Sequence, residues 1–381
     1  MIDTDKKLIC PITNSKKFLN IFSIKRFPIY MGVVSKNYKT ESKNMNFKIN
    51  KKSGTVQIFP RVPLKKLYFK SHGSGKIGKV WNDHHKEFFK FTKKYLNKKI
   101  LEIGGGHNSI SNMFVNLKKK DNIILTSFDP NGRKLKNIKH TLIKDFFNSQ
   151  NIKKYKIKSD INLIIHSHLI EHIYSPRQFL AKINHLLSND GYHIFSVPNL
   201  KQMIKNGYAN AMNFEHPFFL DEKMLDFLLG QSGFKIIRKK YFKSSHSIFY
   251  LTKKNKIKKK ILPNFFSKNK KIFLKLKNKW FKDIKLLNRL ILDKKDIFIF
   301  GAHIFSQNLI FNGLNFKKIK YILDNDPNKN NQFLYGTKIQ VKNPAILKNY
   351  NNPLVILRAG PYNQEIKRNI IKNINNKTIF I

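Results

Sequence analysis

A glycine-rich turn limits what this chain can fold into more than any other segment. The residues KKILEI predict a buried strand that ends at Glu102-Ile103, and Gly104, Gly105 and Gly106 follow it directly. Glycine at such a point lets the backbone turn sharply and approach a ligand closely. SISNMFVNLKKK after the turn predicts a helix, so the three segments indicate the strand–turn–helix unit of an α/β domain.

The alternation of strands and helices continues to about residue 253. SPRQFLAKINHLLSNDG predicts an amphipathic helix closed by Asp190-Gly191. The other predicted strands are NIILTSFDP, SDINLIIHS, GYHIFSVPN, GFKIIRKKYF and SSHSIFYLTKK. Elements of these lengths in this order predict a doubly wound, Rossmann-like α/β domain over residues 96–253.

A second, smaller α/β unit is predicted over residues 295–381. Its three predicted strands are DIFIFGAH, IKYILDND and NPLVILRAG. Residues 254–294 are rich in Lys and Asn and predict a basic linker that ends in a helix, DIKLLNRLILD. Residues 1–95 contain short apolar runs broken by Pro, Gly and Lys, and form a separate N-terminal region.

Two carboxylates indicate which ligand the larger domain would take. Glu102 lies just before the glycine turn, where its charge opposes a pyrophosphate and suits a cationic ligand. Asp129 ends the second predicted strand, where an acid contacts ribose hydroxyls in folds of this kind. Ser109 replaces the third glycine of G-x-G-x-x-G, so a dinucleotide is not favoured. Any one of these features also occurs in ordinary turns, and it is their order and spacing that favour a ligand site.

These segments resemble the class I S-adenosylmethionine-dependent methyltransferases. The likeness is carried by LEIGGGHNS, SFDPN and NLIIHSHLIEHI. It implies S-adenosyl-L-methionine as cofactor, with Glu102 and the backbone of Gly104, Gly105 and Gly106 against its amino-acid part. It also places other residues on the cofactor: Asp129 on the ribose, Asp145 and Phe146 beside the adenine, and His168 along the edge.

The whole layout resembles the sugar C-methyltransferases that act on nucleotide-linked keto-sugars. That family has an N-terminal zinc-ribbon-like region, a central methyltransferase domain and a C-terminal Rossmann-like domain. The likeness rests on ICPIT, YFKSHGSGKIGKVWNDHH, FIFGAHIFSQNLI, YILDNDPNK, YGTKIQVKNPAIL and PLVILRAGPYNQEI. It implies C-methylation of a nucleotide-activated sugar in glycoconjugate or surface polysaccharide biosynthesis.

The chain differs from that family in the residues that bind the metal and in the catalytic residues. Cys10 is the only cysteine and Thr13 stands at the second ligand position, so we expect no metal. The family's Tyr-x-Glu-His segment reads NFEH here, without its tyrosine. By residue type His216 is the candidate base, and Glu215 would orient it or fix a sugar hydroxyl. Tyr68 is the candidate for the upstream catalytic tyrosine, with Phe69 as the other occupant of that position.

Several alternatives stay open from the sequence. A base such as His216 also serves an oxygen nucleophile, so an O-methyltransferase acting on a sugar or another small molecule is the first alternative. The lost cysteines and tyrosine suggest an inactive subunit, which the intact glycine turn argues against. Glu215-His216 could also do no more than cap the following helix, FFLDEKMLDFLLGQSG.

The chain is strongly basic, with 75 Lys and Arg against 22 Asp and Glu and a formal net charge of +53. Such a charge is typical of proteins that bind nucleic acid. Here most of the basic residues are lysine rather than arginine, and they are spread over every segment instead of clustered. We therefore expect no nucleic-acid partner, and an RNA-binding protein or RNA methyltransferase is the second alternative.

Two motifs match other enzyme classes in part. The segment from His168 to His172 has the H-x-x-E-H spacing of some zinc proteases, which requires both histidines on one helical face. It follows a strand of a parallel sheet, so we expect these histidines to line or underlie the cofactor edge instead. GSGKIGKV, which ends at Val80, is one residue short of a phosphate-binding P-loop and lacks its Ser or Thr.

No apolar run of about 18 residues is present, so membrane insertion is not expected. MIDTDKKLICPIT lacks the apolar core of a signal peptide, which predicts a cytoplasmic protein. The sequence does not indicate an oligomeric state.

Overall fold

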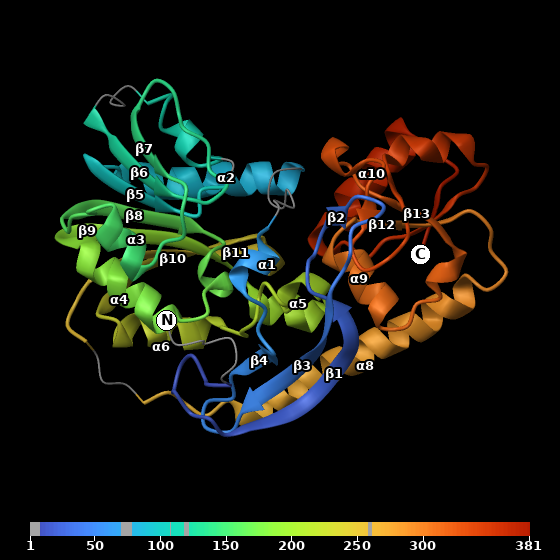
Figure 1. Cartoon of the computed structure of the whole chain (residues 1–381), viewed down its shortest axis with the longest axis horizontal. Coiled ribbons are helices and arrows are strands. Elements are labelled where there is room, and N and C mark those ends of the chain that lie inside the picture. Colours follow the sequence, from blue (N-terminus) through green and yellow to red (C-terminus); the bar gives the residue numbers. More distant parts are fainter. Residues whose placement is uncertain (1–7, 70–77, 107, 118–121, 258–260) are drawn as a thin grey trace.

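A computed structural model describes residues 8–69, 78–106, 108–117, 122–257 and 261–381. Figure 1 shows two α/β units side by side, with an N-terminal sheet and one long helix running below both. Most of the P-loop-like segment, residues 73–77, lies outside the described residues.

The larger unit contains a seven-stranded sheet in the order β10-β11-β9-β8-β5-β6-β7. Its strands are β5 (Lys99–Ile103), β6 (Ile124–Phe128), β7 (Lys139–Ile143), β8 (Ile161–Ser167), β9 (Leu187–Pro198), β10 (Phe234–Phe242) and β11 (Ser247–Lys254). Strands β5 to β9 are parallel, and β11 runs antiparallel to both of its neighbours. The predicted doubly wound sheet is therefore confirmed, including the two neighbouring strands at its end.

The strand order creates a crevice at the carboxyl ends of β5 and β8. Strands β6 and β7 lie on one side of β5, while β8 and β9 lie on the other. In open α/β sheets, ligands bind where the order reverses in this way. Ile103 pairs with His166, so the segments that follow β5 and β8 leave the sheet side by side.

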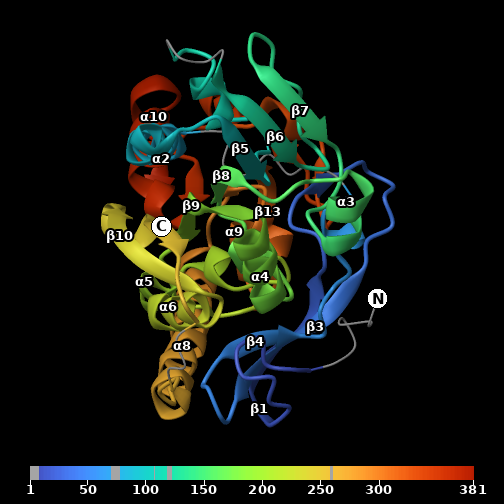
Figure 2. The same ribbon diagram turned by 90° about the vertical axis from the view of Figure 1, so that its left-hand side faces the viewer.

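Helices cover both faces of this sheet, and Figure 2 shows α2 and α4 on opposite sides of it. The covering helices are α2 (Lys79–Thr92), α3 (Ser149–Lys154), α4 (Pro176–Leu186) and α6 (Glu222–Gln231). The unit also contains α5 (Leu200–Asn206), which packs in the core of the N-terminal sheet, and the short α7 (Lys243–His246). Two apolar clusters fill the space between helices and sheet, one on each face.

The predicted helix after the glycine turn is wrong over the part of it that the structure describes. Residues 109–117 form turns with a short 3₁₀ segment, Ser111–Met113. Serine and asparagine recur in this stretch and hydrogen-bond to nearby backbone, which competes with the helix. Asp190-Gly191 does not close a helix either, because α4 ends at Leu186 and β9 begins at Leu187.

The smaller unit is a five-stranded parallel sheet in the order β15-β13-β12-β16-β17. The strands are β12 (Ile297–Phe300), β13 (Ile319–Leu323), β15 (Val341–Lys342), β16 (Leu354–Ile356) and β17 (Ile379–Phe380), with helices α9 (Ile304–Phe311) and α10 (Asn363–Asn373). The three predicted strands correspond to β12, β13 and β16, so the second α/β unit is confirmed. In the segment before it, α8 (Phe266–Leu290) forms a single 25-residue helix. The predicted linker is therefore wrong from Phe266 onward, and the helix begins well before DIKLLNRLILD.

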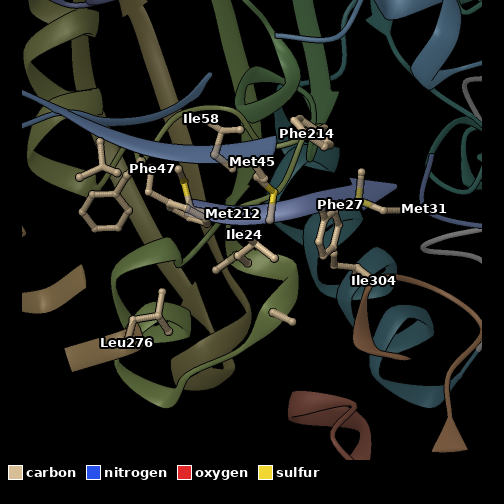
Figure 3. Packing of buried hydrophobic residues seen from close by; sticks show 14 of the residues in the cluster. Ile24, Phe27, Met31, Met45, Phe47, Ile58, Met212, Phe214, Leu276 and Ile304 are labelled. Atoms are coloured by element: carbon tan, nitrogen blue, oxygen red, sulfur yellow. The ribbon is translucent and has the colours of Figure 1, made fainter. Parts of the chain in front are cut away.

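The N-terminal region connects both units. Strands β1 (Phe18–Pro28), β3 (Ser42–Asn50) and β4 (Val56–Phe59) form an antiparallel sheet, and β2 (Val33–Val34) pairs with β14 (Phe333–Leu334) of the smaller unit. Figure 3 shows residues from this sheet packed against Met212 and Phe214 of the larger unit, Leu276 of α8 and Ile304 of α9. One core therefore fixes the two α/β units against the same sheet.

Cys10 lies buried against the turn between β3 and β4. Its Sγ is 3.3 Å from Ser53 Oγ and 3.8 Å from Thr55 Oγ1, and Asn50 hydrogen-bonds to the same serine. Neutral hydrogen bonds thus hold this turn. No helix in the described residues is long and apolar enough to span a bilayer.

Candidate active site

A cavity of about 420 Å³ occupies the crevice at β5 and β8 and extends to the smaller unit. One wall is formed by the glycine turn, the segment after β8 and the loop before α6. The opposite wall comes from the carboxyl ends of β12 and β13 and the N-terminus of α10. Among the residues that line it are Glu102, Gly104, Gly105, Gly106, His168, Glu171, His172, Glu215, His216, Gly301, Asp324 and Lys329.

The glycine turn has little room for side chains except at Gly106. Gly104 has a φ of +70°, and a Cβ there would lie 3.0 Å from Leu169 Cδ1. A Cβ on Gly105 would lie 2.7 Å from the carboxylate of Glu102. Gly106 also has a positive φ, +56°, but a Cβ there would meet nothing within 4 Å. The turn is therefore packed on the protein side and open on the cavity side.

Glu102 is a buried carboxyl group, 3% exposed, at the end of β5. Burial, together with the nearby Asp129 charge, raises the pKa of Glu102 to about 7, against a hydrogen bond that Ser127 Oγ donates to Glu102 Oε2. A cation in the cavity would favour the ionised form of this group. Glu102 and the open face of Gly106 together fit a ligand that carries positive charge.

Asp129 holds the glycine turn in place. Its Oδ2 accepts the Gly106 N–H at 2.6 Å, and its Oδ1 accepts the Asn131 N–H at 2.7 Å. Asp145 and Phe146 follow β7 at the same edge of the sheet, where Asp145 Oδ1 accepts the Phe146 N–H at 2.9 Å. Of the predicted cofactor residues, these three are not among the described residues that line the cavity, whereas the others line it.

A second group of polar residues, from the segment after β8 and the loop before α6, lines the same cavity. His216 Nδ1 is 2.8 Å from the Asn210 carbonyl, and a carbonyl only accepts, so Nδ1 carries the hydrogen and Nε2 the lone pair. The ring of His172 lies 4.5 Å from that of His216, edge to face. Glu171 and Glu215 are buried beside them.

Burial sets the protonation of this group. It lowers the pKa of His216, which is therefore neutral near pH 7 and can act as a base. It raises the pKa of Glu215 to about 8 and the pKa of Glu171 to about 7. Glu215 is thus mostly a neutral carboxyl group at pH 7, able to donate a hydrogen bond.

Tyr68, rather than Phe69, faces this group. Its hydroxyl lies 2.7 Å from His172 Nδ1, and the same nitrogen is 3.0 Å from the Glu215 carbonyl. Phe69 is 44% exposed and packs on Tyr38. Tyr68 is not among the described residues that line the cavity, so it contacts the site through His172.

Glu215 and His216 do not cap the following helix. The N-cap of α6 is Asp221, whose side chain accepts the Met224 N–H. Asn213, which stands where the resembled family has tyrosine, accepts the N–H groups of Glu215 and His216 with its Oδ1. This turn directs the two residues toward the cavity, and the helix-cap interpretation is wrong.

The H-x-x-E-H segment is not a helical zinc-protease site. His168 has a φ of +49°, and a 3₁₀ turn, Ile170–His172, follows it. His168 Nε2 lies 2.8 Å from Ser247 Oγ, while His172 faces Tyr68, so the histidines belong to two clusters.

Sequence reasoning gave Glu171 and His172 no primary role, and it missed Tyr30. Tyr30 is buried, and burial together with the Glu215 carboxyl group raises its pKa. The only sequence signal for the first two was their place after a parallel strand. Tyr30 comes from the N-terminal region and had no local signal.

Among the residues that the structure describes, two groups have nitrogen or oxygen atoms close enough to hold a metal ion. They are Glu171, His172 and His216, and separately His84, His168 and His246, with the possible ligand atoms of each group within 4.8 Å of one another.

Residues 76–239 match the family model of a methyltransferase domain. The site and this match define the chain as an S-adenosylmethionine-dependent methyltransferase, with S-adenosyl-L-methionine as its cofactor. Residues 258–381 match a second model, the C-methyltransferase C-terminal domain. The comparison with curated proteins finds no match.

The comparison with solved structures finds matches of low sequence identity. An S-adenosylmethionine-dependent methyltransferase from Clostridium acetobutylicum ATCC 824 is 13% identical with a TM-score of 0.35, and the match covers 48% of this chain and 94% of that one. The glycopeptide N-methyltransferase MtfA complexed with sinefungin is 12% identical with a TM-score of 0.34, covering 45% and 93%.

Proposed function

We propose that this methyltransferase methylates a carbon atom of a nucleotide-activated keto-sugar, in glycoconjugate or surface polysaccharide biosynthesis. The observation that carries the proposal is the position of His216 and Glu215, which line the same cavity as Glu102 and the glycine turn. The match of residues 258–381 to a C-methyltransferase domain supports carbon as the acceptor.

Five of the proposed cofactor residues line the cavity. S-adenosyl-L-methionine supplies a methyl group on a positively charged sulfur. Glu102, Gly104, Gly105 and Gly106 would hold its amino-acid part, with His168 along its edge. Asp129 would reach the ribose while keeping its bond to the Gly106 N–H, because each carboxylate oxygen has a second lone pair. Asp145 and Phe146 would lie beside the adenine.

His216 would act as the base. A carbon next to a ketone becomes nucleophilic when its proton is removed, and Nε2 of His216 carries the lone pair for this step. The hydrogen bond from Nδ1 to the Asn210 carbonyl fixes the ring in this tautomer. His216 would take the proton as the carbon bonds to the methyl group, and the methyl–sulfur bond would break to leave a neutral thioether.

Glu215 would stabilise the enolate oxygen. Its raised pKa keeps a hydrogen on the carboxyl group at neutral pH, so it can donate to an oxygen that gains negative charge. Tyr68 would position His172 through the 2.7 Å contact. A neutral acid and a neutral base in one cavity are the pair that enolate formation needs.

The smaller unit would hold the nucleotide part of the substrate. Gly301, Asp324 and Lys329 line the far wall of the cavity, and Lys329 Nζ lies 2.9 Å from Asp324 Oδ2. A substrate with a sugar near His216 and a charged, hydroxyl-rich part near Lys329 would contact both units.

O-methylation is the second candidate, and Asn213 favours it. Replacing the family's tyrosine by Asn213 removes one hydroxyl donor for an enolate, whereas a hydroxyl nucleophile needs the base alone. The two reactions place the methyl group on different atoms, so product analysis separates them.

The test is to incubate the full chain with cofactor that carries a ¹³C-labelled methyl group and with a panel of nucleotide-linked keto-sugars and their reduced hydroxyl forms. We expect mass gain in a keto-sugar and a carbon-bound methyl signal in NMR spectra. His216→Asn is the matched control for enzyme-dependent transfer. An oxygen-bound methyl would establish the second candidate, and no transfer to any nucleotide sugar would refute the substrate class.

A further inference from the structure

Three histidines meet beside the cavity, two of them buried and His168 partly buried, and none of the three moves a proton in the proposed reaction. His84 lies on α2, His168 follows β8, and His246 ends α7. His84 is 0% exposed and His246 is 5% exposed. Their ring centroids are 5.2 to 5.8 Å apart, and Trp81 packs edge-on against all three rings. We call His84, His168 and His246 the three-histidine cluster.

Two nitrogens of this cluster lack a hydrogen-bond partner. Nε2 of His84 and Nε2 of His246 are buried, and neither is bonded to any residue that the structure describes. Buried polar groups are nearly always paired, so such atoms indicate something that binds there. One nitrogen from each ring lies within 4.8 Å of the others, which is compatible with a common ligand.

Two histidines of the cluster have a hydroxyl or carboxyl group beside a ring nitrogen. His246 Nδ1 lies 2.6 Å from Ser247 Oγ, and His168 Nδ1 lies 3.4 Å from Glu171 Oε1. The same serine hydroxyl lies 2.8 Å from His168 Nε2, so an ion bound at that nitrogen would take the place of this contact. A histidine that binds a metal through one nitrogen almost always donates its other N–H to a carboxylate, carbonyl or hydroxyl group.

We propose that His84, His168 and His246 bind one divalent transition-metal ion of the zinc type through imidazole nitrogens. Three imidazoles suit Zn²⁺, and three protein ligands leave a fourth position for water or another ligand. His168 and His246 line the cavity, which provides a path for the ion. The expectation of no metal came from the missing cysteines, and sequence alone gave no sign that residues 84, 168 and 246 meet.

The ion would fix α2 to the sheet. His84 comes from a helix, while His168 and His246 lie at the ends of two strands on the other side of the cluster. The ring centroid of Trp81, on the same helix, lies 4.8 Å from that of His246, and Trp81 lines the cavity. Binding of the ion would therefore hold the Trp81 side of the cavity in position.

The experiment measures metal binding by the full chain without an affinity tag. Protein freed of metal by a chelator is titrated with Zn²⁺ by calorimetry and with Co²⁺ by absorption and tryptophan fluorescence. We expect one ion per chain, d–d absorption typical of four-coordinate Co²⁺, and quenching from Trp81. His84→Gln and His246→Gln should weaken binding by more than the ~10- to 100-fold that loss of an outer partner costs, and Ser247→Ala by about 10-fold.

Two variants make the result specific. His185→Gln changes an exposed histidine on α4 and should bind the ion as the wild type does. His216→Asn tests the other possible metal group, Glu171, His172 and His216, and should also leave binding unchanged. The wild-type Co²⁺ spectrum tests the proposal even if a cluster variant does not fold. The proposal fails if the wild type binds no stoichiometric ion, or if His216→Asn abolishes binding while His246→Gln retains it.

Discussion

The hydroxyl oxygen of Tyr68 lies 2.7 Å from Nδ1 of His172, which joins the N-terminal region to the segment after β8. His172 in turn lies edge to face on His216, with 4.5 Å between ring centroids. The N-terminal region therefore contributes to the geometry of the candidate base, although it lies outside the larger α/β unit.

Tyr68→Phe should lower kcat by about 2- to 10-fold, the size of one hydrogen bond, with little change in KM or in cofactor affinity. The ring stays in place while the bond to His172 is lost. Steady-state kinetics and calorimetry measure these quantities. Phe69→Leu is the control, because Phe69 is partly exposed and should leave kcat unaltered. Equal losses in both variants would mean that the N-terminal region acts on stability alone.

His216→Asn should reduce turnover by about 10²- to 10⁴-fold, the usual contribution of a general base. Asparagine cannot take the proton but is similar in shape to histidine. Binding of S-adenosyl-L-methionine should therefore persist with a micromolar Kd, which corresponds to a binding free energy of about 8 kcal/mol. Unchanged turnover in this variant would contradict the role of His216, and His172 would become the candidate base.

The dependence of kcat on pH should be bell-shaped. The rate rises as His216 loses its proton, and burial lowers the pKa of His216, so this limb lies below the ordinary value of about 6.5. The rate falls as Glu215 loses its proton near pH 8, because burial raises the pKa of Glu215 to about 8.

Glu215→Gln separates the two limbs. Glutamine keeps a hydrogen-bond donor without titrating, so the fall above pH 8 should disappear and the loss of activity should be smaller than in His216→Asn. Persistence of the alkaline limb would assign it to another group.

Gly106→Val should weaken cofactor binding at least 10-fold because its side chain enters the open side of the turn, where a Cβ meets nothing within 4 Å. The positive φ of Gly106 adds strain of about 1–2 kcal/mol, which thermal unfolding would detect. Gly104→Val should also abolish binding, but it crowds Leu169 as well.

Gly230→Ala provides the matched control. It is also a glycine whose Cβ would meet no atom within 4 Å, but it lies in α6 without a positive φ. Cofactor binding should be unaffected by this change. A Kd for Gly106→Val equal to that of Gly230→Ala would refute the position of the cofactor.

Local sequence patterns suffice to predict the strands and the glycine turn, because the alternation of apolar and polar residues and the turn residues each depend on only a few neighbouring positions. They place Glu102 and the three glycines correctly on the cavity. They fail for residues 109–117, where the apolar spacing suggests a helix but Ser and Asn disfavour one.

Contacts between segments that are distant in the sequence cannot be predicted from such local patterns. Tyr68 and His172 are 104 positions apart, and the three-histidine cluster spans three separate elements. Which of Tyr68 and Phe69 faces the site depends on the packing of Phe69 against Tyr38, which no spacing in the sequence encodes.

The pairing of β2 with β14 has a consequence for synthesis of the chain. Val33 and Val34 emerge from the ribosome early, but their partners, Phe333 and Leu334, are made near the end. The Glu41 N–H likewise donates to the Tyr335 hydroxyl across 294 positions. Contacts between such distant positions form slowly, because a long loop must close first. The N-terminal region is therefore expected to complete its packing only after translation has ended, and a chain stopped before residue 333 would leave its apolar surface accessible to chaperones.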